Sequence, residues 1–230
     1  SMAGARLDGA IAALTQLVDR LNPTDNFGLV AFDDQVELTV PAGGQLLLVD
    51  VVKSQFGFEG KGALELRSAG GEPFSAVART YNTAASGTYG QAIDGQSFVS
   101  EQDGIAFTAG VRNGGGFRAN IGAVNASAVA INLLAEVIDA SGALRGTRTF
   151  TLLPWSTEQV AVSSFVGEIA SCSIRWRCTS TDTGIEWVAY ASVVDNASGD
   201  AVYLEERADY SYTQVQPTAQ VGGFWDGTLL

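Results

Sequence analysis

Apolar and polar residues alternate along most of this chain, which is the pattern of half-buried β-strands. In one stretch every second residue is apolar, at Val129, Ile131, Leu133, Ala135 and Val137. Residues 139–142 then read Asp-Ala-Ser-Gly, a sequence typical of a tight turn. Residues 145–153 return as a second strand, so this region predicts a β-hairpin.

A second alternating segment carries both cysteines of the chain. One of its faces holds Cys172, Ile174, Trp176 and Cys178, and we expect that face to be buried. On a straight strand the two cysteines would lie ~20 Å apart, too far for a disulfide. We therefore expect core thiols; a disulfide is the alternative if the strand folds back, because export favours oxidation.

Helical periodicity is clear near the beginning of the chain. Between residues 5 and 21, apolar residues recur at three- and four-residue steps, at Leu7, Ile11, Leu14, Val18 and Leu21. Asn22-Pro23 predicts the end of this helix. Residues 27–32 are apolar throughout, as in a buried strand, and Asp33-Asp34 turns the chain into the alternating residues 36–40.

The first 38 residues, SMAGARLDGAIAALTQLVDRLNPTDNFGLVAFDDQVEL, resemble the start of a bacterial von Willebrand factor A domain. In that family a metal sits on an Asp-x-Ser-x-Ser loop, a later Thr and a later Asp. Here only Ser1 matches, as the last Ser of the loop, and no loop with the Thr follows Val40. The resemblance implies the helix-to-strand arrangement, and we expect no cation at Ser1.

Three blocks of sequence recur in the same order at almost the same spacing. TVPAGGQLLLVDVV matches LLPWSTEQVAVSSFV, GALELRS matches SIRWRCTS, and AVARTYNTAASGTYG matches AYASVVDNASGDAVY. Pro41 and Pro154 are 113 positions apart, and Gly87 and Gly199 are 112 apart. A period of this length predicts duplicated sandwich-sized units. The second copy has a front section, residues 117–152, that the first lacks.

The phrases ARTYNTAASGTYGQ, FRANIGAVN and AYASVVDNASGDAVY also resemble β-sandwich modules that occur in tandem in large secreted bacterial proteins. This resemblance spans residues 39–205 and implies fold and location, without a defined activity. We predict a mainly β fold of tandem β-sandwich (Ig-like) units with one N-terminal α-helix. The expected domains are a von Willebrand factor A-like fragment at 1–38, a partial first unit at 39–110, a second unit at 111–206 and a tail at 207–230.

The charge balance argues against two classes of partner. The chain has 25 acidic and 13 basic residues and a net charge of −12, which opposes binding to nucleic acid or to anionic lipid. Its apolar runs are far shorter than the ~20 residues of a membrane helix, so we expect no membrane insertion. No signal peptide opens the chain, and we expect an export signal to lie upstream.

The absence of histidine argues against an enzyme. It removes Ser-His-Asp and Cys-His arrangements, the usual zinc sites and the commonest general base near neutral pH. The acids fall mainly at turns and strand ends, where their pKa values should stay near ~4. Glu136 and Glu186 interrupt apolar strands, and we expect both to point to solvent.

Aromatic residues offer one candidate binding site. Trp155, Tyr81 and Tyr190 could stack on sugar rings if they are exposed together. Trp155 follows Pro154 in a loop, and we expect it to be the exposed tryptophan. The structural interpretation is a core role, with Trp176 and Trp187 facing each other across a hairpin that turns at residues 181–184.

The loop of Asp195, Asn196 and Asp200 offers oxygen ligands for calcium, but the same residue types are what any tight turn selects. The corresponding loop of the first copy, 82–87, has no acids, so a shared turn explains both and we expect no metal or cofactor. Residues 110–116 are glycine-rich without the Lys of a phosphate loop, and we interpret them as a linker or hairpin between the copies.

Taken together, the pattern predicts a non-catalytic structural or interaction module of a secreted or cell-surface bacterial protein. Its partners would be other domains of the parent protein, and extracellular glycans or proteins. A carbohydrate- or protein-binding adhesin module that uses exposed aromatics is the alternative.

Overall fold

The structure is a computed structural model that describes residues 38–208, apart from gaps at 41–42, 58, 61, 69–70, 72, 86, 97 and 99–103. The predicted helix at 5–21, the strand at 27–32, Ser1 and residues 209–230 lie outside the described residues. The chain divides into two compact units, Ser1–Gly62 and Ala63–Leu230, and each is described by itself.

In the first unit, one short helix lies where the sequence indicated strands and turns. Helix α2 (Val51–Phe56) follows Asp50, whose φ of 49° reverses the chain. Gly57 ends the helix in the left-handed conformation and donates its backbone N–H to the Lys53 carbonyl at 3.0 Å. The matching block of the second copy also contains a helical turn, η1 (Val162–Ser164).

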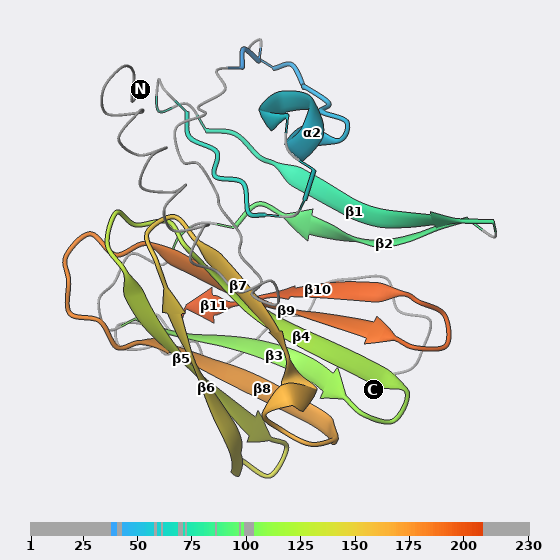
Figure 1. The fold of residues 1–230 in the computed structure, drawn as a ribbon, viewed down its shortest axis with the longest axis vertical. Helices are drawn as coiled ribbons and strands as arrows, with labels where there is room; N and C mark the ends of the chain where they lie inside the picture. Colours follow the sequence, from blue (N-terminus) through green and yellow to red (C-terminus); the bar gives the residue numbers. More distant parts are fainter. Residues whose placement is uncertain are drawn as a thin grey trace, which may run out of the picture. The chain divides into compact units, whose positions relative to one another are not determined.

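The second unit is built from antiparallel strands in two facing sheets and a separate hairpin (Figure 1). One sheet has the order β10-β9-β4-β7 and the other β11-β3-β8-β5-β6; β1 and β2 pair with each other. The strands are β1 (Val77–Ala84), β2 (Gly87–Asp94), β3 (Ile105–Asn113), β4 (Phe117–Asn125), β5 (Ile131–Asp139), β6 (Leu144–Leu152), β7 (Thr157–Ala161), β8 (Ile169–Cys178), β9 (Trp187–Asp195), β10 (Ala201–Glu205) and β11 (Arg207–Ala208).

The predicted hairpin at 129–153 is confirmed as β5 and β6. The Asp139 carboxylate accepts the backbone N–H groups of Ser141 at 2.9 Å and Ala143 at 3.0 Å. Gly142 has a φ of 85°, which side chains other than glycine rarely adopt. Local turn chemistry therefore sets the place where β5 reverses.

The core lies between the inner faces of the two sheets. The predicted apolar face of β5 is buried from Ile131 to Val137, and so is the face of β8 that carries Cys172 and Cys178. From the other sheet, β4 and β9 contribute Ala119, Ile121, Ala123, Trp187, Ala189 and Ala191. Burial of these side chains is the main force holding the layers together.

The prediction that Trp176 and Trp187 face each other across a hairpin is wrong. Both are fully buried, but Trp176 lies on β8 and Trp187 on β9, in different sheets. Trp176 packs against Phe150 with ring centroids 5.6 Å apart and donates its indole N–H to Thr108 at 3.0 Å. Residues 181–184 thus lead from one layer to the other.

The repeat seen in the sequence has a counterpart in strand register. Tyr81 on β1 pairs with Gly90 on β2, and the residues 112 positions later, Val193 and Val202, pair with each other on β9 and β10. The two hairpins therefore have equivalent registers. A second complete sandwich is not confirmed within the described residues, where the sheets of the sandwich come from residues 105–208.

Two predicted boundaries fall inside the sandwich. Strand β3 spans the expected junction between residues 110 and 111 and pairs with β8 over its length. Arg207 and Ala208, expected in a tail, form β11 and pair with Phe107 and Ala106 of β3. The glycine-rich segment 110–116 forms the end of β3 and the turn to β4, where Gly114 and Phe117 exchange two backbone hydrogen bonds.

Candidate functional site

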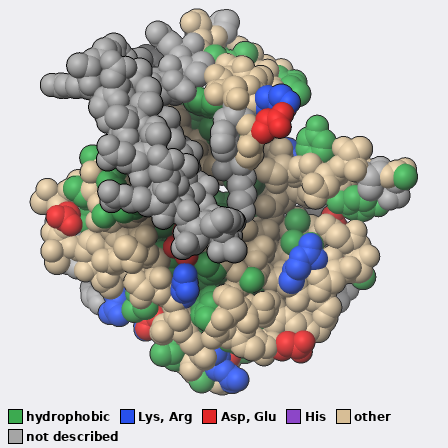
Figure 2. Space-filling view, viewed as in Figure 1, with side chains coloured by type: hydrophobic (Ala, Val, Ile, Leu, Met, Phe, Trp, Pro, Cys, Tyr) green, Lys and Arg blue, Asp and Glu red, His purple; other side chains and the backbone are tan. Residues whose placement is uncertain are grey.

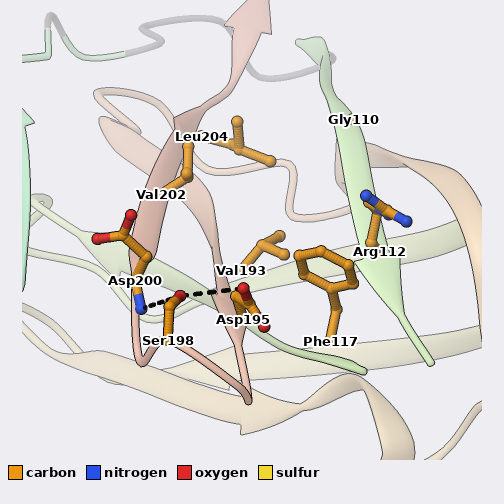
Figure 3. A pocket seen from close by; sticks show the side chains of 9 residues that line it. All are labelled: Gly110, Arg112, Phe117, Val193, Asp195, Ser198, Asp200, Val202 and Leu204. Atoms are coloured by element: carbon orange, nitrogen blue, oxygen red, sulfur yellow. Dashed lines mark hydrogen bonds between the residues drawn. The ribbon is translucent and has the colours of Figure 1, made fainter. Parts of the chain in front are cut away.

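A groove of about 350 Å³ opens at one end of the sandwich (Figure 3). Strand β3 borders it on one side and the β9–β10 hairpin on the other. Its lining combines one basic residue, two acids and an apolar floor: Gly110, Arg112, Phe117, Val193, Asp195, Ser198, Asp200, Val202 and Leu204.

Strand β3 is irregular where it borders the groove. Its register with β8 shifts between Thr108 and Val111 and again before Asn113, and Gly110 has a φ of 80°. Within the part of the chain that the structure describes, strand β11 pairs with β3 at Ala106 and Phe107. A bulge of this kind twists the strand edge and weakens it as a template for another strand.

Several polar groups of the groove already contact other residues that line it. Arg112 stacks over the Phe117 ring with 3.9 Å between the guanidinium carbon and the ring centroid. The Ser198 hydroxyl donates to Asp195 at 3.0 Å and accepts the backbone N–H of Asp200 at 3.1 Å (Figure 3). The Ser198 hydroxyl thus holds the turn together, and Asp195, whose pKa is lowered by the hydrogen bonds that it accepts, is a weak base toward it.

The calcium candidates lie in the turn between β9 and β10, beside this groove. The Asp195 carboxylate accepts the Ala197 backbone N–H at 2.8 Å as well as the Ser198 hydroxyl, and these bonds lower its pKa. The Asn196 side-chain oxygen accepts a hydrogen bond from Arg118. These contacts are those of a self-capping turn. Asp200 also lines the groove.

Within the ranges that the structure describes, no three Asp, Glu, Cys or His side chains gather in a way that could hold a metal ion. The expectation of no metal at Asp195, Asn196 and Asp200 remains a prediction.

The three aromatic candidates lie on different elements. Trp155 is in the β6–β7 turn, 38% exposed, with a φ of 56° that is unusual for a bulky residue. Tyr81 is exposed on β1, with the Arg79 guanidinium over its ring at 5.3 Å. Tyr190 stacks on Tyr203 with centroids 5.1 Å apart, and burial raises its pKa. Their ring contacts do not join them into one platform.

The cysteines occupy the core face of β8 and are not joined to each other. Burial raises the pKa of the Cys172 thiol to about 11. A thiol with so high a pKa is a poor nucleophile at neutral pH, and this supports a packing role for Cys172.

The expectation that Glu136 and Glu186 point to solvent is wrong. Glu136 is buried and accepts two hydrogen bonds from the Arg175 guanidinium, at 2.7 and 2.9 Å, which lower its pKa. Glu186 is half-buried and pairs with Arg67 at 2.9 Å. The neighbouring strands supply the arginines, and strand alternation by itself does not reveal them.

Sequence reasoning also missed a polar cluster around Glu206, a residue with only 8% exposure. Burial raises the pKa of Glu206 to about 7, contrary to the expectation that the acids keep ordinary values. Its carboxylate accepts a hydrogen bond from Gln96, whose side-chain oxygen accepts the Tyr203 hydroxyl. The sequence carries no signal for it, because residue 206 is buried through its place opposite buried Ala189 on the neighbouring strand.

On the face shown in Figure 2, charged side chains of both signs lie scattered between polar and backbone atoms. The described part of the chain contains no helix with the length and apolar character needed to cross a membrane.

Comparison with known proteins gives no relative from which an activity could be transferred. No protein-family model, no curated protein and no solved structure matches this chain.

Proposed function

We propose that this chain is a non-catalytic structural or interaction module of a secreted or cell-surface bacterial protein. One observation carries this: a hairpin of the first repeated segment is packed against the sandwich of the second. The Ser192 hydroxyl on β9 donates to Gln91 on β2 at 3.0 Å, and Gln96 bonds to Glu206 and Tyr203. Contacts of this type are what modules in series need in order to dock.

The chemistry of the described acids supports the same proposal. Glu136 and Glu186 are held by arginines, and Asp139 and Asp195 bind the backbone of their own turns. Glu206 has a pKa suited to a general acid, but its hydrogen-bond partner is the amide of Gln96. The proposed partners are the other domains of the parent protein. The von Willebrand factor A-like start and the sandwich modules in series are the parts of the chain that would contact them.

The direct test is an assay of purified protein with polysaccharide, ester and peptide substrates. We expect no turnover above that of buffer. Turnover that disappears in Glu206→Gln, the variant of the acid best suited to proton transfer, would contradict the proposal, as would the same result for Glu136→Gln or Glu186→Gln. Turnover that persists in all three variants would instead indicate a contaminating enzyme, and Glu205→Gln, a change at a partly exposed neighbour, is the control that should leave any turnover unchanged.

A carbohydrate- or protein-binding adhesin module is the second candidate, favoured by Trp155. An exposed tryptophan held at a positive φ is an unusual backbone state that often marks a binding site. Affinity electrophoresis through immobilised polysaccharides checks it. This candidate requires retardation that Trp155→Ala abolishes and that Leu153→Ala, a change at an exposed neighbour, leaves intact.

A further inference from the structure

We infer that the outer edge of β1 accepts an extended strand from another module, which adds to the β1–β2 hairpin as β4 adds to β9. The partner is a segment in which every second residue is apolar, as in β4. This inference rests on the proposed interaction-module function and names the surface and the class of partner that the module would use.

Strand β1 is exposed along its length. Every residue from Val77 to Thr83 is exposed, and Val77 and Tyr81 have exposed fractions of 68% and 55%. Among the described strands the partner of β1 is β2, which contacts the sandwich where Gln91 accepts the Ser192 hydroxyl. Strand β1 lies on the side of β2 away from β10 (Figure 1). The second edge of β1 is therefore the surface to consider.

The hydrogen-bond pattern of the hairpin determines which backbone groups face this edge. Gly95 donates its backbone N–H to the Ala76 carbonyl at 2.8 Å, so these two residues form a hydrogen-bonded pair. Such pairs alternate with non-bonded pairs along antiparallel strands, and the register of β1 with β2 continues without a shift. The odd-numbered residues of β1 therefore point their N–H and C=O groups away from β2: Val77, Arg79, Tyr81 and Thr83.

Strand β1 is also more regular than edges of the sandwich sheets. Edge strands are usually protected from strand addition by bulges, proline, charged residues or shortness. Strand β3 is irregular around Gly110, and β7 is five residues long. Strand β1 pairs with β2 through all eight of its residues, contains no proline and carries one charged residue, Arg79. It is therefore a suitable template for another strand.

The repeat indicates what kind of strand would bind. The β9–β10 hairpin is the counterpart of β1–β2 in the second repeated segment, and β9 lies between β10 and β4. Strand β4 pairs with β9 over its whole length, from Phe117 to Asn125. The front section that contains β4, residues 117–152, has no counterpart in the first copy. A β4-like strand from a neighbouring module would give β1 the neighbour that β9 already has.

A synthetic peptide of the β4 sequence, FRANIGAVN, tests this by NMR-detected hydrogen exchange of the full chain. In the free protein the outward-facing amides of β1 should exchange at nearly unprotected rates, whereas those of Ala78, Thr80 and Asn82 are protected by β2. Saturating peptide should slow the outward-facing amides about 10-fold or more. A control peptide with both Ile121→Pro and Gly122→Pro cannot pair as a strand and should have no effect.

A pair of variants separates strand addition from stacking on the Tyr81 ring. Tyr81→Pro removes the ring and an outward-facing N–H, and should weaken peptide binding about 10-fold or more. Tyr81→Ala, the matched control, removes the ring but keeps the N–H, and should change the affinity less than about 3-fold. Fluorescence anisotropy of labelled peptide measures both. The exchange experiment needs no variant, so it decides the question even if Tyr81→Pro disturbs the hairpin.

Four results would overturn this inference. Outward-facing amides that are already protected in the free monomer would show that the chain covers its own edge. Protection that appears only as the protein concentration rises would show that a second copy binds there instead. Equal weakening by Tyr81→Pro and Tyr81→Ala, or no effect of about 1 mM peptide, would also contradict strand addition. None of these results bears on catalysis, which the turnover assay decides separately.

Discussion

At the scale of single residues, Gly122 shows how a strand glycine can be required by packing. Glycine usually weakens the interior of a strand. Here a Cβ on residue 122 would lie 2.5 Å from the ring carbon Cζ of Tyr190. The ring cannot easily move away, because it stacks on Tyr203 and donates its hydroxyl to Gln159 at 2.9 Å.

Gly122→Ala should therefore destabilise the protein by about 1–3 kcal/mol, the usual range for overpacking. Urea unfolding followed by tryptophan fluorescence measures it. Gly167→Ala is the matched control, since no atom lies within 4 Å of its added Cβ, and should change stability by less than about 0.5 kcal/mol. If the ring is the cause, the cost of Gly122→Ala should largely vanish in a Tyr190→Ala background.

The buried thiols give a second prediction at this scale. At about pH 8 the native protein should react slowly with a thiol reagent, because both cysteines are buried and the pKa of Cys172 is raised to about 11. Both should react at once in concentrated urea. Reducing agent should not change the number of reactive thiols in urea; an increase of two would show the disulfide alternative instead.

At the scale of elements, β5 and β8 are joined by a charged pair on the outer face of their sheet. Glu136 and Arg175 lie directly opposite each other in the strand register. Arg175 covers the carboxylate while staying partly exposed itself, so the pair avoids the full desolvation of a buried ion pair. Two parallel hydrogen bonds also fix the register of the two strands.

Glu136→Gln should cost about 1–2 kcal/mol at neutral pH, less than a fully buried pair because Arg175 is partly solvated. The Arg175 hydrogen bonds lower the pKa of Glu136 below 4.5, so its stabilisation is present above that pH and is lost as pH falls through the lower native value. Urea unfolding should show that the difference in the free energy of unfolding between variant and wild type is smaller at about pH 3 than at about pH 7.

The matched control is Glu158→Gln, which removes a partner of Arg148 in a more exposed pair. It should cost less than about 1 kcal/mol. A Glu136→Gln difference that is the same at both pH values would contradict the pairing.

At the scale of the whole sandwich, a buried asparagine ties the two sheets together. Asn125 ends β4 and is fully buried. Its amide nitrogen donates to the carbonyls of Leu153 and Val129, at 2.9 and 2.7 Å, and Leu152 lies at 3.3 Å. Its oxygen accepts the Ser127 backbone N–H at 2.9 Å. One side chain of the four-stranded sheet thus satisfies main-chain groups next to β5 and β6, which belong to the other sheet.

Asn125→Ala should destabilise the protein by about 2–4 kcal/mol, because it leaves several buried backbone groups without partners. Thermal unfolding followed by circular dichroism measures the loss. Asn132→Ala removes an exposed asparagine bonded to Thr151 and should have an effect below about 0.5 kcal/mol. Equal effects of the two variants would rule out the role given to Asn125.

Much of the strand pattern is determined by the sequence itself. The buried faces of β5 and β8, the turn after Asp139 and the equivalence of the β1–β2 and β9–β10 hairpins follow from alternation, turn residues and the repeat. These features are local, because strand period and turn chemistry depend on residues a few positions apart. The alternation of β5 also predicts that Glu136 lies on the outer face of the sheet, but it does not predict that the side chain is buried there.

Only the tertiary structure decides which strands meet. It places Trp176 and Trp187 in opposite sheets, supplies Arg175 to Glu136 and opens the groove beside Arg112. It also brings Gln96 to Glu206, which are 110 positions apart. The physical reason is the same in each case: burial and the pKa shifts that follow from it are set by neighbours that approach through space, and alternation along one strand carries no information about them.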